Sequence, residues 1–321
     1  MESYPFLQEY NGAFGLDISG DFSWESVLNA ILNFAGDTLN DTHRGVLLIL
    51  GISILGLLIH SDIQTTSNSM AQYTAWVITG VCAYPIVSDF IKMVAVAKEG
   101  VSNITALMLS SVPAMVSLPI STGAGVFLLI TQITGALMLS FFLPLLLCQT
   151  GLGVCDTITE RFSLRSIRQM LKNVFAWGLG VVMLIFSITS SICGVLAGAG
   201  GTVVGRSLRY ASSMIPVVGK YLSESAEMIY AGSASIKGTL GVGICIAVIG
   251  CMLAPFLRIM IYVFVYKFVS FCIKPFGLPS VVKLTDAVAE GLGGLAGITI
   301  LTAAIGLINV SVMIRSVGMS I

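Results

Sequence analysis

The chain has 321 residues, of which 56% are hydrophobic and only 10% are charged, and its mean hydropathy is +0.96. Soluble globular domains carry about 25% charged residues, so this chain lacks the polar surface that a water-soluble protein needs. Its 16 basic and 16 acidic residues cancel, which removes the positive excess typical of nucleic-acid-binding proteins. These proportions predict an integral membrane protein that does not bind nucleic acid.

Residues 1–43 form an acidic tail. Seven acidic residues precede the first basic residue, Arg44: Glu2, Glu9, Asp17, Asp21, Glu25, Asp37 and Asp41. No basic stretch followed by an apolar core opens the sequence, so no secretory signal is expected. The lack of positive charge mildly favours an extracytoplasmic tail. That position requires residues 101–118 to be re-entrant, whereas eight full crossings would place the tail in the cytoplasm.

Residues 44–321 are expected to form a multi-pass membrane domain. A helix needs about 20 apolar residues to cross a bilayer core, and the apolar runs are continuous rather than alternating, which favours helices over a barrel. Pro255 and Arg258 are expected to divide the longest run into two helices. The sequence therefore predicts an all-α bundle of seven or eight spans. The apolar runs cover residues 45–59, 70–91, 101–118, 123–148, 174–197, 238–273 and 292–314.

A basic segment follows the run that ends at residue 148. Arg161, Arg165, Arg168 and Lys172 are separated by steps of four, three and four residues, which places them on one face of a helix. This pattern is typical of an amphipathic helix on an anionic cytoplasmic membrane surface. An ordinary loop that sets topology explains it equally well. Both interpretations put residues 156–172 in the cytoplasm, and the loop 198–237 then lies outside.

The chain contains no convincing pattern for an active site, a cofactor or a metal ion. Residues 200–207 approach the phosphate-loop motif, but Arg206 stands where that motif needs lysine, and a membrane span precedes it. His43 and His60 have no carboxylate at zinc-protease spacing, and no G-x-S-x-G motif is present. The seven cysteines include no C-x-x-C pair. We therefore expect no enzyme, no cofactor and no metal site.

Charged residues within apolar runs are better functional candidates, because charge is costly inside a membrane. Arg258 either marks a turn or faces a polar interior, and Lys267 lies near the middle of an expected helix. Both are candidates for lining a conduit. Three further charges, Asp89, Lys92 and Glu290, lie at or near expected span ends. Gly293 and Gly297 form a G-x-x-x-G motif, which favours close packing within the chain or against another subunit.

Three strings give the sequence a recognisable likeness. They are RSLRYASSMIPVVG at residues 206–219, APFLRIMIYVFVYK at 254–267 and KPFG at 274–277. With them the chain resembles the stage III sporulation protein AE family of endospore-forming bacteria, from about residue 44 to the C-terminus. The likeness is strongest over residues 201–290. Lys220 departs from the glycine that the family usually shows there.

The resemblance implies a multi-pass membrane component of a sporulation channel complex. In that family the complex contains the other stage III A proteins, lies in the mother-cell membrane around the forespore, and joins a forespore ring protein. It is thought to support late forespore gene expression, through passage of small molecules or secretion. Candidate contact residues in the external loop are Arg206, Arg209, Pro216 and Gly219.

Three other functions are compatible with the sequence: a stand-alone secondary transporter, a scaffold that anchors other subunits, and an intramembrane enzyme. A homo-oligomer is also compatible with it. The bilayer is an expected partner in every case.

Overall fold

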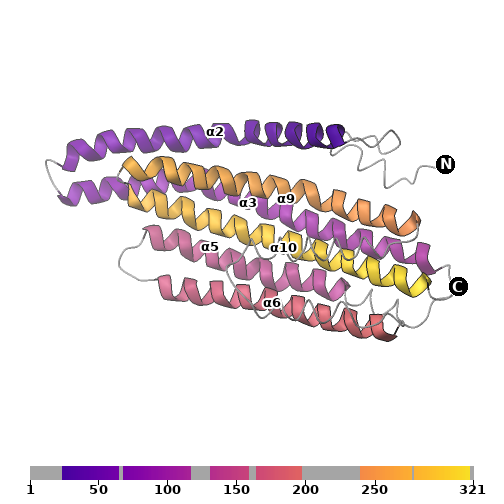
Figure 1. Cartoon of the computed structure of the whole chain (residues 1–321). Helices are drawn as coiled ribbons and strands as arrows, with labels where there is room; N and C mark the ends of the chain where they lie inside the picture. The colour runs from indigo at the N-terminus through magenta and orange to yellow at the C-terminus, as the bar shows by residue number, and fades with distance from the viewer. Residues whose placement is uncertain are drawn as a thin grey trace. The chain divides into compact units, whose positions relative to one another are not determined.

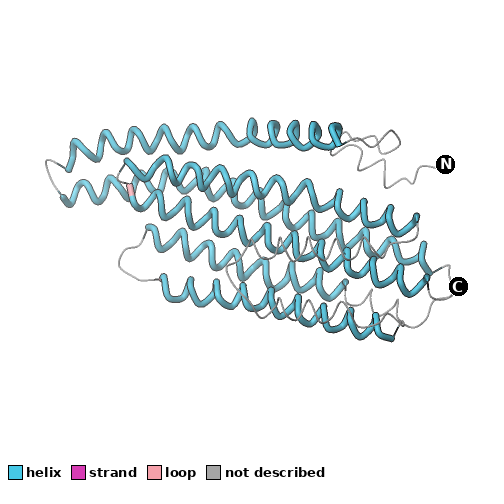
Figure 2. The backbone as a smooth tube through the Cα atoms, viewed as in Figure 1, coloured by secondary structure: helices cyan, strands magenta, loops and turns pink. Residues whose placement is uncertain are grey.

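The computed structural model describes residues 24–64, 68–116, 131–158, 164–196, 239–276 and 278–318. Every regular element in these ranges is helical, and Figure 2 shows no strand among them, which confirms the all-α prediction. Five helices in the described ranges are long and apolar enough to cross a membrane. The number of seven or eight spans is not confirmed.

The helices are long, and Figure 1 labels them in chain order. Residues 131–137 are helical and continue through a π-helical segment into α5. A 3-10 segment, η2, joins α9 to α10. The elements are α2 (Trp24–Gln64), α3 (Asn68–Val116), η1 (Met138–Phe142), α5 (Leu143–Ile158), α6 (Arg165–Leu196), α9 (Thr239–Ile273), η2 (Lys274–Phe276) and α10 (Pro279–Gly318).

One helix, α3, contains most of two predicted spans. The sequence predicts separate spans at 70–91 and 101–118, but α3 runs without interruption through residue 116. Lys98 and Glu99 are exposed on it. Charged side chains can reach a polar environment from a helix that continues, so their presence does not end α3. The prediction of two spans here is wrong.

The prediction that Pro255 and Arg258 divide residues 238–273 is also wrong. Pro255 lies inside the continuous helix α9. A proline within a helix removes one hydrogen bond and needs space for its ring. Gly100 of α3 provides that space, since a Cβ on Gly100 would lie 2.9 Å from Cγ of Pro255. The chain therefore turns only after residue 273, at η2.

By contact density the chain forms two compact units. Unit 1 comprises residues 1–96, 145–172 and 257–296, and unit 2 comprises residues 97–144, 173–256 and 297–321. Four of the long helices thus contribute one part to each unit. Those helices are α3, α6, α9 and α10.

Within unit 1, α10 packs closely against α3 and α5. A Cβ on Gly291 would lie 2.8 Å from Cγ2 of Thr150 and 3.0 Å from Cε2 of Phe90. Gly294 lies similarly close to Leu146. Glycines allow helices to approach this closely. They are not the predicted G-x-x-x-G pair, because a Cβ on Gly293 or on Gly297 would meet nothing within 4 Å.

Unit 2 has its own apolar core. Met108, Val248, Leu307 and Val310 form a buried cluster. The ring of Phe142, in η1, packs edge-on against Phe175 with centroids 5.9 Å apart. Of the residues in the most apolar 18-residue stretch of α10, 83% are buried, against 17% in the corresponding stretch of α6. Thus α10 is an inner helix, and α6 exposes most of its apolar surface.

Candidate functional site

Among the described residues, ion pairs occur in unit 1 alone. They join Asp89 to Lys92, Asp41 to Arg258, Asp286 to Lys267, and Glu290 to both Arg168 and Lys172. The described helices of unit 2 contain three charged residues: Lys98, Glu99 and Arg315. The polar chemistry of the described chain is therefore concentrated in unit 1, which we treat as the candidate site.

The most enclosed charge is the carboxylate of Asp89, whose side chain is 12% exposed. Lys92 Nζ donates to its Oδ1 at 2.9 Å, and the buried Tyr266 hydroxyl donates to its Oδ2 at 3.0 Å. Gly45 of α2 leaves room for Oδ2 of Asp89, since a Cβ on Gly45 would lie only 3.2 Å from that oxygen. Both carboxylate oxygens thus have donors, as a charge inside an apolar bundle requires. Asp89 connects α3 to α9.

Arg258 pairs with Asp41 of α2, with Nη2 3.3 Å from Oδ2. The sequence leaves open whether Arg258 marks a turn or faces a polar interior, and the continuity of α9 excludes the turn. Its side chain is 39% exposed, and that of Asp41 is 68% exposed. Asp41 belongs to the acidic tail predicted at residues 1–43, whose residues 24–43 form the first half of α2. That carboxylate therefore neutralises a basic residue of α9.

Lys267 pairs with Asp286 across the α9–α10 hairpin, with Nζ 3.0 Å from Oδ1. Lys267 lies six residues before the end of α9, and Asp286 lies seven residues after the start of α10. Their nearly equal distances from the turn bring them to the same level of the hairpin. Lys267 is thus a paired cation rather than an isolated one.

Glu290 of α10 accepts from two residues of the predicted basic face. Arg168 Nη2 lies 2.8 Å from its Oε2, and Lys172 Nζ lies 3.6 Å from the same atom. Both cations lie in the first turns of α6, so the predicted loop 156–172 is largely helical. Arg165 is exposed and has no such partner among the described residues. Two cations of the basic face therefore pair with α10, and Arg165 remains exposed.

The end of α5, the start of α6 and η2 lie at the same end of unit 1 (Figure 1). Gly153 of α5 lies beside Ala287 of α10 and the guanidinium of Arg168, which joins α5, α6 and α10 near this end. The positive-inside rule predicts that this basic end faces the cytoplasm. If α9 were divided into two spans, the chain would cross the membrane once more before residue 274, and residues 274–278 would lie on the extracytoplasmic side.

Several predicted site residues lie outside the described part of the chain: Arg161, Arg206, Arg209, Pro216 and Gly219. The loop 198–237 and its phosphate-loop-like string lie there too. In the described ranges, no group of three or more His, Cys, Asp or Glu side chains could hold a metal ion.

Sequence reasoning missed three acceptors or donors of the site: Asp41, Tyr266 and Asp286. Once α9 is known to end at Ile273, the nearly equal distances of Lys267 and Asp286 from the turn predict that they pair. The contact of Tyr266 with Asp89 joins residues 177 positions apart, so no local pattern announces it. The pair Asp89–Lys92 was readable, because residues three apart are neighbours on a helix.

Comparison with known proteins identifies relatives. The family model described as stage III sporulation protein AE matches residues 16–317. The stage III sporulation protein AE of Bacillus subtilis (strain 168) is 23% identical over 291 residues, which cover 86% of this chain and 72% of the relative. No solved structure matches the chain.

Proposed function

Because the chain belongs to the stage III sporulation protein AE family, we propose that it is the multi-pass membrane component of the stage III A sporulation complex. The family match confirms the resemblance and gives the chain a role in sporulation. Five helices apolar enough to span a bilayer make it a membrane protein. The proposed location is the mother-cell membrane that surrounds the forespore.

The observation that carries this proposal is the extent of the family match, from residue 16 to residue 317. The match includes every ion pair of unit 1, so the paired charges belong to the family-matched region. The proposed partners are the other stage III A proteins and the forespore ring protein. The proposed contact region is the loop 198–237, with Arg206, Arg209, Pro216 and Gly219.

One structural observation bears on how the chain works in this complex. Arg258 and Lys267 each have a carboxylate partner. Paired charges hold helices together at low net charge, which supports a scaffolding role for these two residues more than a role in lining a conduit. A membrane scaffold without its own catalytic chemistry is therefore the second candidate function.

Affinity purification of the tagged full chain from sporulating cells tests the proposal. We expect the other stage III A proteins to co-purify after membrane solubilisation, and we expect a deletion strain to lose heat-resistant spores. The same tag on an unrelated multi-pass protein is the control. Recovery of the chain without these partners, together with normal spore counts in the deletion strain, would contradict the proposal.

A scanning series in the loop 198–237 separates the scaffold from the conduit. A scaffold predicts that Arg206→Ala or Gly219→Ala reduces co-purification, while Arg258→Ala and Lys267→Ala leave sporulation intact. Spore loss in the last two variants with the complex still assembled would instead favour a conduit.

A further inference from the structure

Two lysines at the α9–α10 turn, like Arg165, differ from the paired cations of unit 1. Lys92, Arg168, Lys172, Arg258 and Lys267 each pair with a carboxylate. Lys274 and Lys283 are exposed, and neither has a carboxylate within ion-pair distance in the described part of the chain. Two positive charges at one turn thus remain to be balanced by a ligand or by solvent ions.

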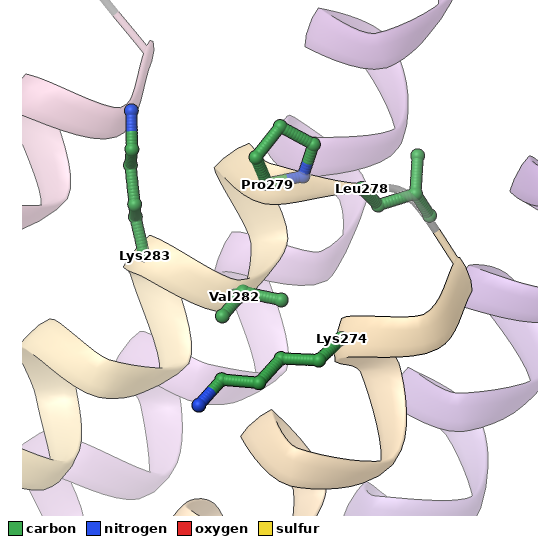
Figure 3. Close-up of a pocket in the computed structure, with 5 residues that line it drawn as sticks. All are labelled: Lys274, Leu278, Pro279, Val282 and Lys283. Atoms are coloured by element: carbon green, nitrogen blue, oxygen red, sulfur yellow. The ribbon is translucent and has the colours of Figure 1, made fainter.

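These lysines line an open hollow of about 280 Å³. Its other lining residues are apolar: Leu278, Pro279 and Val282. Figure 3 shows Lys274, the first residue of η2, and Lys283, in the first turns of α10, on either side of Val282, with their ammonium groups directed apart. Leu278 is buried, so the hollow has an apolar floor. A ligand for this site needs negative charge for the lysines and apolar surface for the floor.

The start of α10 adds a further attraction for an anion. The helix begins at Pro279, next to the hollow. Helix N-termini carry partial positive charge and favour phosphate. This contribution reinforces the two lysines, which define the site.

The position of the turn indicates where the ligand comes from. Lys274 and Lys283 share their end of unit 1 with the end of α5 and with Arg165 at the start of α6 (Figure 1), and the positive-inside rule predicts a cytoplasmic position for that end. Basic pockets between membrane helices on this side bind the head groups of acidic lipids.

We propose that the hollow between Lys274 and Lys283 binds the phosphate group of an anionic phospholipid. The two exposed lysine side chains turn toward the bound phosphate and neutralise it, and Leu278, Pro279 and Val282 contact the glycerol and the upper acyl chain. A soluble phosphate shares the charge but cannot use the apolar floor, which favours the lipid. The site is independent of the proposed role in sporulation.

Native mass spectrometry of the purified full chain in detergent tests this site. The chain is offered equal amounts of phosphatidylglycerol and phosphatidylcholine, and the ratio of bound lipids is measured. We expect the unmodified chain to prefer phosphatidylglycerol. The double variant K274Q/K283Q should lower that preference about thirtyfold, since each basic residue near an anionic surface contributes about 1 kcal/mol.

The variant K98Q is the control for the single variants K274Q and K283Q. It removes one charge from an exposed residue that does not line the hollow, and it should keep the preference, whereas each single lysine variant should lower it. An unchanged preference in K274Q/K283Q, or an equal loss in the control, would overturn the proposal. Circular dichroism confirms that all variants remain helical.

Inorganic phosphate at matched ionic strength distinguishes the two sources of the ligand group. For a lipid site, we expect phosphate to leave bound phosphatidylglycerol in place. Displacement of the lipid by phosphate, with phosphate raising the melting temperature of the unmodified chain but not of K274Q/K283Q, would show that the ligand is soluble and would overturn the lipid assignment.

Discussion

Units 1 and 2 both contain buried hydroxyls that bond to their own helices, but they differ in their charged groups. In unit 1 a carboxylate faces a cation or a hydroxyl from another part of the chain, as Asp89 faces Tyr266. In unit 2 the buried groups are neutral. Thr302 donates to the carbonyl of Ile298 one turn earlier in its own helix, and the side-chain amide of Asn309 donates to Thr131.

The difference has an energetic consequence. A hydroxyl that bonds to its own helix needs no partner elsewhere, so the loss of a neighbouring side chain leaves it satisfied. A buried charge needs its partner, because an unpaired charge in an apolar environment is costly. Unit 1 should therefore be more sensitive to single substitutions than unit 2, and the predictions below test that expectation.

The largest effect is expected from the same change made in both units. Gly291→Ala in unit 1 places a methyl group against Thr150 and Phe90, and Thr150 is held by a 2.9 Å hydrogen bond to Leu146. We expect a loss of about 3 kcal/mol in the free energy of unfolding. Gly306→Ala in unit 2 meets the flexible end of Met108, which can move, so its loss should be below about 1 kcal/mol.

Unfolding of the purified chain in detergent, followed by circular dichroism, measures both values. Gly293→Ala is the control, because its added methyl group meets nothing within 4 Å. Equal losses in Gly291→Ala and Gly306→Ala would remove the difference between the units.

The second prediction concerns the buried carboxylate. Asp89→Leu leaves the Tyr266 hydroxyl buried without its acceptor, and we expect a loss of about 2 kcal/mol. Tyr266→Phe should cost less, since Asp89 keeps Lys92. The double variant D89L/Y266F should be more stable than D89L alone, because it removes the orphaned hydroxyl. Additive losses in this cycle would show that the two side chains do not interact.

A smaller effect is expected from the corresponding polar contact of unit 2. Asn309→Leu removes the hydrogen bond to Thr131, but it also removes a buried amide oxygen that has no partner among the described residues. The two contributions oppose each other, so we expect a change of about 0.5 kcal/mol or less. A loss as large as that of D89L would contradict the proposed difference between charged and neutral contacts.

The smallest effect is expected from Arg258→Ala. The pair with Asp41 is partly exposed to solvent, and exposed pairs contribute about 1 kcal/mol or less. Thermal unfolding should barely change, and heat-resistant spore counts should equal those of the parent strain. Glu25→Ala, which removes a charge at the start of α2, provides a reference for spore counts. Fewer spores at unchanged stability would assign Arg258 a role beyond packing.

Composition and hydrophobic runs predicted much of the fold. The continuous apolar runs gave the helical class, and most helices contain a predicted run. The division at Pro255 failed because the space for its ring comes from Gly100, which lies 155 positions earlier. Sequence rules treat proline as a local signal, but here the outcome depends on a distant residue.

The sequence predicted the charged residues of the candidate site but only one of their pairs. Arg258 and Lys267 were recognised as costly in apolar surroundings, and Asp89, Lys92 and Glu290 were placed at or near span ends. Apart from the pair Asp89–Lys92 within α3, their partners come from other helices, so local periodicity could not supply them. Arg168 and Lys172 also show the limit of a helical-face argument: the face was correct, but Glu290 of α10 occupies two of its charges. External-loop candidates such as Arg206 lie outside the described residues.

The pair Lys267–Asp286 has a consequence for biogenesis. The two charges are 19 residues apart in one hairpin, so little chain entropy is lost when they meet. Lys267 can therefore be neutralised as soon as the first turns of α10 have been synthesised. We expect α9 and α10 to enter the bilayer together as a hairpin, since Lys267 on α9 alone would enter the apolar layer without its counter-ion.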